Sequence, residues 1–112
     1  MIKTIALAHR KAGLSHEEFC KYWEEQHGPL AARLVPRLRR YVQNHYIEVP
    51  GYKYEGDGIV EMWYDDLEAY QEFMTYIRSG EGKILAADTL NFADMSNSRL
   101  WIVEEHVIKE YE

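Results

Sequence analysis

The chain has 112 residues, which is enough for one domain with one hydrophobic core and too few for two, so we expect a single domain over residues 1–112. Hydrophobic residues make up 46% and charged residues 29%, a balance typical of globular proteins. The net charge of -6 argues against a nucleic-acid partner, because binding to a phosphate backbone needs a basic face. No apolar run approaches the length of a membrane span, and the single cysteine, Cys20, excludes an intrachain disulfide. These features predict a cytoplasmic protein with no membrane partner.

The stretch S-H-E-E-F-C-K-Y-W-E-E-Q-H-G-P-L, which begins at Ser15, predicts the first helix. Ser15 and Glu18 have the spacing of a capping box, in which each side chain accepts a hydrogen bond from a free backbone N–H of the first turn. The aromatic residues that recur at helical spacing are Phe19, Tyr22 and Trp23. Gly28 and Pro29 predict the end of this helix. His27 then lies at the helix C-terminus, along the edge of the apolar face.

The rest of the chain predicts four strands and shorter helical segments in the order β-α-β-β-α-β, which is the ferredoxin-like α+β fold. In this fold a four-stranded antiparallel sheet has its helices on one face. The expected strands are Ile2–His9, Leu38–Val49, Ile59–Tyr64 and Arg99–Tyr111, and the expected helical segments after the first helix are Leu30–Val35, Leu67–Arg78 and Lys83–Asn91.

Both faces of the expected sheet are apolar. Val60 and Trp63, for example, point to opposite faces of the third strand. The helices can cover only one face, and a large bare apolar surface is rare in a monomer. We therefore expect a homodimer in which two copies pack through their sheet faces.

Several stretches resemble the EthD family of dimeric α+β barrel proteins: H-R-K-A-G-L-S-H-E-E-F, Y-W-E-E-Q-H-G-P-L-A, R-R-Y-V-Q-N-H, V-E-M-W-Y-D-D-L-E-A-Y and A-D-T-L-N-F-A-D. The resemblance implies a dimeric α+β barrel. The wider relatives include cofactor-free isomerases of methylmuconolactones, dehydratases and cyclases of aromatic polyketides, quinone-forming monooxygenases and haem-degrading enzymes. One methylmuconolactone isomerase branch is similar in placing a working His near the end of the first helix, which matches His27. That branch also uses a later cysteine, and this chain has none beyond Cys20.

Three residues are candidates for catalysis. His27 can exchange a proton near neutral pH, although a histidine at a helix C-terminus is also favoured by the helix dipole alone. His45, in the second strand, either converges with His27 or makes a structural hydrogen bond. Glu61 interrupts the apolar third strand, so it is either a base or, as we favour, the partner of a buried group.

Five aromatic residues are candidates for binding a ligand. A pocket between the helices and the sheet would be walled by aromatic rings, and a tyrosine hydroxyl there would donate a hydrogen bond to an enolate or phenolate oxygen. The alternative is that these side chains are core. The residues are Trp23, Tyr41, Tyr46, Trp63 and Tyr70.

No metal motif or phosphate-binding glycine loop is present, so we expect no cofactor. The leading hypothesis is a cofactor-independent enzyme that acts on a small aromatic, lactone or polyketide-like substrate by proton transfer at His27, as an isomerase, dehydratase or cyclase. A second hypothesis is a non-catalytic binding protein or an accessory to an ether or aromatic degradation system. A third is the handling of haem or metal, as in some relatives.

Overall fold

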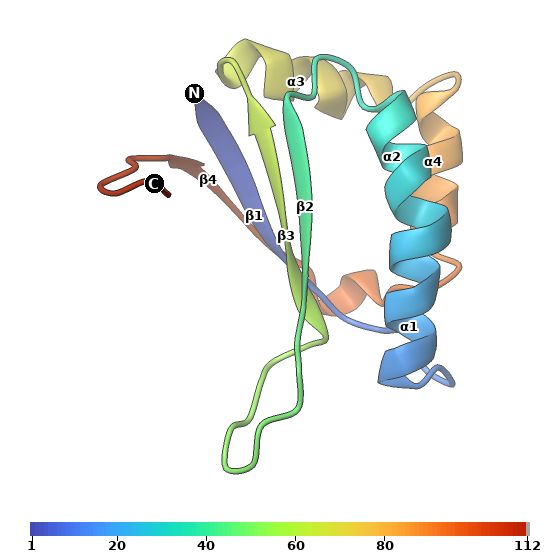
Figure 1. The fold of residues 1–112 in the computed structure, drawn as a ribbon. Coiled ribbons are helices and arrows are strands. Elements are labelled where there is room, and N and C mark those ends of the chain that lie inside the picture. Colours follow the sequence, from blue (N-terminus) through green and yellow to red (C-terminus); the bar gives the residue numbers. More distant parts are fainter. Residues whose placement is uncertain (112) are drawn as a thin grey trace.

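The computed structural model describes residues 1–111, and its elements follow the expected order. The strands and helices lie side by side in two layers (Figure 1). The elements are β1 (Ile2–Ala8), α1 (His16–Tyr22), the π-helical turn η1 (Trp23–His27), α2 (Gly28–Leu34), β2 (Arg40–His45), β3 (Gly58–Tyr64), α3 (Leu67–Tyr76), α4 (Gly82–Thr89), the 3₁₀ turn η2 (Met95–Asn97) and β4 (Arg99–Glu104).

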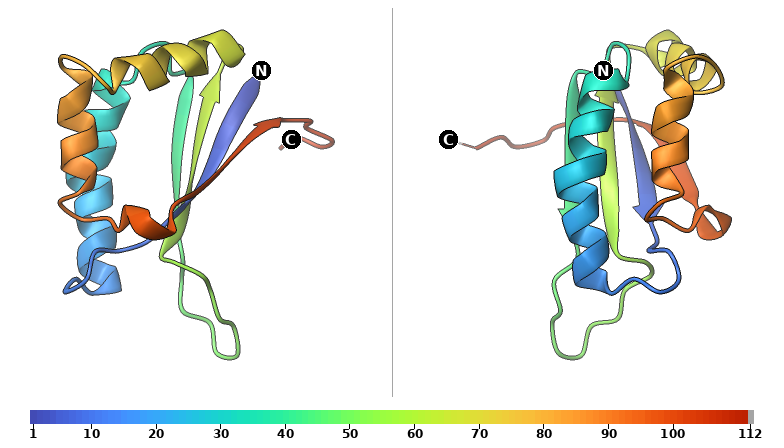
Figure 2. Two further views of the ribbon diagram at one scale, coloured as in Figure 1. Left: turned by 180° about the vertical axis from the view of Figure 1, so that it is seen from behind. Right: turned by 90° about the vertical axis from the view of Figure 1, so that its right-hand side faces the viewer.

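The four strands form one antiparallel sheet in the order β2-β3-β1-β4. Helices α1, α2 and α4 run along one face of this sheet, while α3 crosses its end (Figure 1). The view from behind shows the opposite face without helices, and the chain after β4 extends away on that side (Figure 2). The ferredoxin-like α+β fold predicted from the sequence is thereby confirmed.

The strand register decides which side chains meet the helices. Thr4 pairs with Met62 and Ala6 pairs with Val60, and these four residues face the helical layer. Ala6 and the next inward residue of β1, Ala8, are small. They leave space between the middle of the sheet and the helices, and a cavity lies at this place.

The first helix does not end at Gly28 and Pro29, as the sequence predicted. It continues through the π turn into α2 and ends after Leu34. In a regular α-helix the ring of Pro29 would clash with a carbonyl of the preceding turn, and its missing N–H would leave that carbonyl unpaired. The wider π turn avoids this: the Gly28 N–H donates to the Trp23 carbonyl, five residues earlier, and Pro29 falls in the first turn of α2, where proline is tolerated.

This correction changes the surroundings of His27. The residue lies in the middle of a continuous helical stretch and not at a free C-terminus, so the helix dipole gives no account of a histidine here. Local widening of a helix by a π turn is frequent at functional sites.

Two clusters of buried side chains hold the layers together. One gathers around Tyr64 and Leu85, between α2, α3, α4 and the sheet. The other is formed by Phe19, Trp23 and Phe92; the ring of Phe19 contacts the other two in tilted arrangements, at centroid distances of 5.3 and 5.2 Å. The cavity opens between the two clusters.

Two strands are shorter than predicted. The β-type sequence of Leu38–Val49 forms a strand only over Arg40–His45, because β3 begins at Gly58. Beyond His45, the Tyr46 N–H still donates to the Asp57 carbonyl at 3.2 Å. The expected strand Arg99–Tyr111 is paired only as far as Glu104, beyond which the chain leaves the sheet (Figure 2). Ile108 in this last segment is 94% exposed.

Candidate functional site

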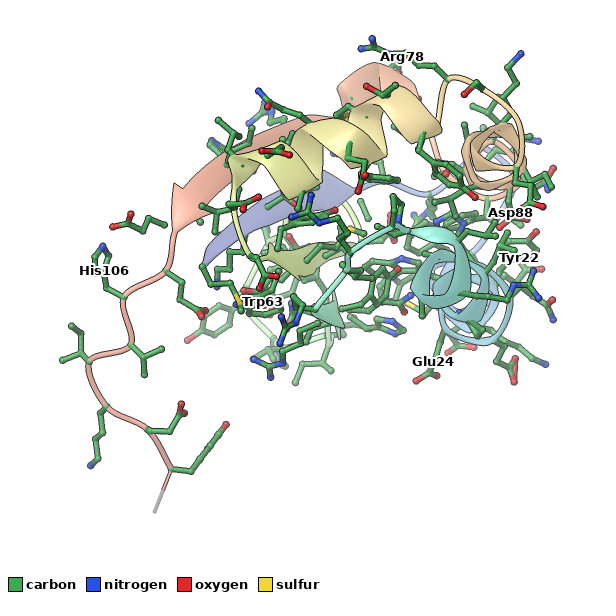
Figure 3. All side chains as sticks on the ribbon, turned by 90° about the horizontal axis from the view of Figure 1, so that it is seen from above. Tyr22, Glu24, Trp63, Arg78, Asp88 and His106 are labelled. Carbon is green, nitrogen blue, oxygen red and sulfur yellow. The ribbon has the colours of Figure 1, made fainter. Side chains whose placement is uncertain are left out.

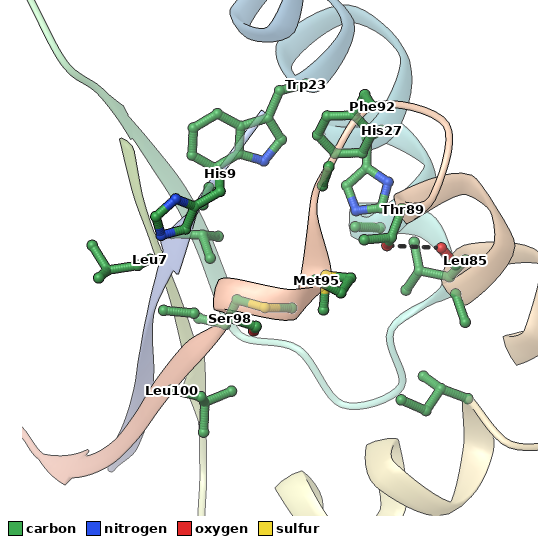
Figure 4. A pocket seen from close by; sticks show the side chains of 18 of the residues that line it. Leu7, His9, Trp23, His27, Leu85, Thr89, Phe92, Met95, Ser98 and Leu100 are labelled. Carbon is green, nitrogen blue, oxygen red and sulfur yellow. Dashed lines mark hydrogen bonds between the residues drawn. The ribbon is translucent and has the colours of Figure 1, made fainter. Parts of the chain in front are cut away.

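A cavity of about 230 Å³ lies between the helices and the inner face of the sheet. The sheet contributes small and aliphatic side chains such as Ala6 and Val60, and the helical stretch contributes Trp23 and His27. Phe92, on the chain that follows α4, completes the wall beside His27 (Figure 4). The walls are mostly apolar, which suits a small ligand with a flat hydrophobic body.

His27 is a buried titratable group of this wall. Its side chain is 12% exposed, and its ring lies 4.8 Å from the ring of Phe92 between centroids. Nδ1 lies 2.8 Å from Oδ2 of Asp88 on α4. Burial lowers the pKa of His27, and the carboxylate offsets this only in part, so the pKa stays below its usual value. The ring is therefore neutral at neutral pH, with its proton on Nδ1 facing the carboxylate and Nε2 unprotonated.

Asp88 accepts hydrogen bonds from three side chains. The Tyr22 hydroxyl donates to Oδ1 at 2.5 Å, His27 donates to Oδ2, and the Asn91 amide lies 3.3 Å from Oδ1. Burial raises the pKa of Asp88, but the hydrogen bonds outweigh it and hold the pKa below its usual value. The bond to Asp88 also raises the pKa of Tyr22. Asp88 is thus ionised, and it orients both Tyr22 and His27 where α1 and α4 meet (Figure 3).

The π turn explains how Tyr22 and His27 reach one carboxylate. Five residues on a regular α-helix span about 140° beyond a full turn, which would put the two side chains on different sides. The wider turn over Trp23–His27 reduces that angle, and both side chains contact Asp88. The π turn that accommodates Pro29 therefore also shapes the site.

Sequence reasoning missed both Asp88 and Tyr22 as site residues. Its helical spacing predicts for Tyr22 only a place on the apolar face of the helix. Asp88 stands in the stretch A-D-T-L-N-F-A-D, whose sequence indicates the family but no role for the carboxylate. The available signal was an acidic residue directly after two alanines in a short apolar helix, where a charge needs a partner.

A comparison with protein families decides the relationship of this chain. The family model for the EthD domain matches residues 11–96. The chain belongs to the EthD family. The resemblance drawn from the sequence motifs is thereby confirmed.

Solved structures with similar folds include other EthD proteins. An EthD family protein from Bacillus halodurans C-125 is 29% identical, with a TM-score of 0.70, and the match covers 95% of this chain and 99% of that chain. An EthD-like protein from Ralstonia eutropha JMP134 is 21% identical, with a TM-score of 0.69 and coverage of 96% and 94%. A Bacteroides fragilis NCTC 9343 protein, described as dimeric with a ferredoxin-like fold and unknown function, is 12% identical, with a TM-score of 0.63 and coverage of 93% and 95%. No curated protein matches the chain.

His45 does not converge with His27 in this EthD domain. It lies on the inner face of β2, where its ring stacks on Trp23 at 4.8 Å and Nε2 lies 2.8 Å from Oε1 of Gln43. Trp23 lines the cavity, and His45 lines a separate pocket outside it with Tyr41 and Gln43. His45 therefore contacts Trp23, a wall residue of the cavity, and does not line the cavity itself.

Glu61 lies on the sheet face that the helices leave open. Its carboxylate is 2.7 Å from Nζ of Lys3 and accepts a hydrogen bond from Asn44 at 3.0 Å. The bond from Lys3 is the main reason that the pKa of Glu61 is below its usual value. The sequence left two roles open for Glu61: a base near an imidazole, or the partner of another group. Its contacts with Lys3 and Asn44 correspond to the role of a partner.

The five aromatic candidates are spread over four places. Trp23 and Tyr41 line the cavity, and Tyr70 is buried in the core cluster around Tyr64. Trp63 lies on the open face of the sheet, where the guanidinium of Arg40 sits 4.5 Å from its ring. Tyr46 lies in the loop after β2.

Within residues 1–111, no group of three or more His, Cys, Asp or Glu side chains has a geometry that could hold a metal ion. Over the same residues, no helix is long and apolar enough to cross a membrane.

Proposed function

We propose that this EthD domain is a cofactor-independent enzyme that moves a proton on a small substrate with a flat, ring-containing body. The observation that carries the proposal is the neutral, buried imidazole of His27, which Asp88 holds in one tautomer at the wall of an apolar cavity. A group with these properties is a suitable general base near neutral pH.

In the reaction that we propose, Nε2 of His27 removes a proton from a carbon next to a carbonyl group. The C–H electron pair becomes the enolate, and His27 becomes an imidazolium whose charge Asp88 balances. The same proton then returns to a different carbon, or to the oxygen of a departing hydroxyl group. The first outcome is an isomerisation and the second a dehydration. An enolate that attacks a carbonyl within the same substrate gives a cyclisation, in which the imidazolium returns its proton to the new alkoxide oxygen.

The other residues expected from the sequence have supporting roles in this proposal. Trp23 and Tyr41 are walls of the cavity, and His45 positions Trp23 by stacking on it. Glu61 takes no part in the chemistry, since its partners lie on the opposite face of the sheet. We place the enzyme in the cytoplasm, where its one thiol, Cys20, would stay reduced.

Proton transfer can be tested with 2-tetralone, a flat ketone with an acidic C–H beside its carbonyl. In D₂O, the protein at micromolar concentration should exchange that hydrogen for deuterium faster than the same concentration of free imidazole, as followed by ¹H NMR. Binding of 2-tetralone without faster exchange would contradict catalysis. That result would favour the second candidate, a non-catalytic binding protein, which rests on the same apolar cavity.

We also propose that the domain forms a homodimer through the open face of its sheet. Apolar residues such as Ile5 and Trp101 pair side by side on this face, and Trp101 is 47% exposed in a single chain. Proteins of similar fold are described as dimeric.

The dimer predicts a clear difference between two charge substitutions. Trp101→Asp should convert a species of two chains into a monomer at micromolar concentration, because it places a charge in the apolar interface. Ile84→Asp is the matched control: Ile84 is similarly exposed but lies on α4, away from the sheet face, so the dimer should persist. Analytical ultracentrifugation measures both. A wild-type monomer, or two variants with the same mass, would contradict the interface.

A further inference from the structure

His9 lies at the boundary between the apolar cavity and a second, polar pocket. It directly follows β1, and its ring lines both spaces. Ser98, just before β4, also lines both. The close view places His9 beside Trp23 and Ser98, on the sheet side of the cavity, whereas His27 comes from the helical side (Figure 4). A ligand in the cavity would therefore meet an imidazole on each side.

The imidazole of His9 is tightly packed, but its hydrogen-bonding groups are not all paired within residues 1–111. Its Nε2 is buried and has no hydrogen-bond partner among residues 1–111. The closest ionic contact of this nitrogen is Oε2 of Glu55, at 3.8 Å, which is too long for a hydrogen bond. Gly56, with a φ of +76°, packs its backbone so closely that a Cβ there would lie 3.4 Å from Cε1 and Nε2. Nε2 is thus closed off by the Gly56 backbone. The other ring nitrogen, Nδ1, makes no hydrogen bond with residues 1–111 and is not buried in the same way, so it is the nitrogen that a ligand can reach.

The polar pocket indicates what His9 faces on the other side. Its remaining walls are the side chains of Glu55, Ser96, Asn97 and Arg99. Here Arg99 and Glu55 form an ion pair at 3.4 Å. The two spaces that meet at His9 thus differ in character: one is walled by apolar side chains, and the other by charged and hydrogen-bonding groups.

We propose that His9 anchors an oxygen of the ligand. The ligand class that fits is a molecule with a flat apolar body, which fills the cavity, and a hydroxyl or carbonyl oxygen at the edge of that body, which contacts His9 beside Ser98. A hydroxyl donates to an unprotonated ring nitrogen, and a carbonyl accepts from a ring N–H. This inference rests on the proposed ligand cavity but not on catalysis. In the proposed reaction, His27 acts at carbon while His9 holds the oxygen.

The test compares 2-naphthol with naphthalene, which differ only by the hydroxyl group. Affinities are measured by NMR titration for the wild type, His9→Leu, His9→Gln, His27→Gln and the control His106→Leu, whose histidine is exposed on the chain after β4. We expect the preference for 2-naphthol over naphthalene to fall about tenfold in His9→Leu, because one hydrogen bond is lost. His9→Gln should keep most of the preference, since an amide can also bond the hydroxyl. His106→Leu should keep all of it.

The outcomes separate this inference from the proposed function. If both ligands bind and the preference is the same in the wild type and His9→Leu, the anchoring role of His9 is overturned while the cavity stands. If only substitution at His27 removes the preference, the oxygen lies at the other imidazole and the inference is again overturned. If neither ligand binds the wild type, the proposed cavity and the role of His9 are both overturned. Naphthalene binding that survives in His9→Leu verifies that this variant is folded.

Discussion

Replacing His27 by glutamine is expected to lower the rate of deuterium exchange into 2-tetralone by about 10³-fold, because the variant loses the general base of the cavity. Glutamine has a similar size and can still donate to Asp88, so the fold and the binding of the ketone should persist. The exchange rate and the Kd of 2-tetralone are measured by NMR on the same samples. The loss should appear in the rate and not in the affinity.

The pH dependence of the exchange rate should identify His27 as the base. Burial holds its pKa below the usual value, and the base acts in its neutral form, so the rate should stay level through neutral pH. It should fall only on the acidic side, as the pH drops through the lowered pKa. Asp88→Asn removes the contact that raises this pKa, which moves the acidic limb to still lower pH. The plateau should also fall, by about 10²-fold, because the amide no longer selects the Nδ1–H tautomer.

His45→Gln is the matched control for His27→Gln. His45 stacks on the wall of the cavity but does not line it, so its replacement should change the exchange rate by less than about tenfold. A loss at His45 as large as that at His27 would reinstate the pair of histidines predicted from the sequence. An unchanged rate in His27→Gln would contradict the proposed mechanism itself.

The fold was predictable because its signals are local. The capping box at Ser15 and Glu18 forms as expected, and alternation along the strands placed Val60 and Trp63 on opposite faces. The end of the first helix was mispredicted because Gly28 and Pro29 are normally a stop signal. Packing overrides that signal here: a Cβ at Gly28 would lie 2.8 Å from Nε2 of Gln43, which itself donates to the Trp23 carbonyl. Such a tertiary contact cannot be recognised from the local sequence.

The candidate site was predictable only in part, for the same reason. His27 could be found because it lies on an apolar helix face within a few residues of Trp23. Asp88 could not be paired with it, since the two are 61 residues apart and meet only through the packing of α4 against the first helix. The sequence left two roles open for His45, and its position corresponds to the structural one, because its ring stacks on the indole of Trp23.

Asp57→Asn is expected to destabilise the protein by about 3 kcal/mol, because it removes the charge of a buried carboxylate that three donors contact. Asp57 is 5% exposed and lies just before β3. Its carboxylate accepts hydrogen bonds from the backbone N–H and the guanidinium of Arg10 at 2.9 and 3.0 Å, and from Nδ1 of His16 at 2.7 Å. Nε2 of His16 is 3.0 Å from the carbonyl of Tyr46. One carboxylate thus joins the end of β1, the start of α1 and the loop between β2 and β3.

The stability lost in Asp57→Asn should depend on pH in a defined direction. Burial raises the pKa of Asp57, but the hydrogen bonds from His16 and Arg10 outweigh it, so the folded-state pKa lies below the unfolded one. A carboxyl group of this kind contributes its full stability above the unfolded pKa of about 4 and loses it as the pH falls through the lowered folded-state pKa. The difference between the wild type and Asp57→Asn should therefore be largest near neutral pH and shrink in acid.

Urea unfolding at one protein concentration, near pH 7 and near pH 3, measures this difference. Asp65→Asn is the matched control, because Asp65 pairs with Arg39 at 2.9 Å but both side chains are largely exposed. The free energy of unfolding of Asp65→Asn should fall by no more than about 1 kcal/mol at either pH. Equal losses for the two variants would mean that burial adds nothing to the Asp57 cluster. A loss in Asp57→Asn that does not shrink in acid would mean that the charge of this carboxylate is not what links the three segments.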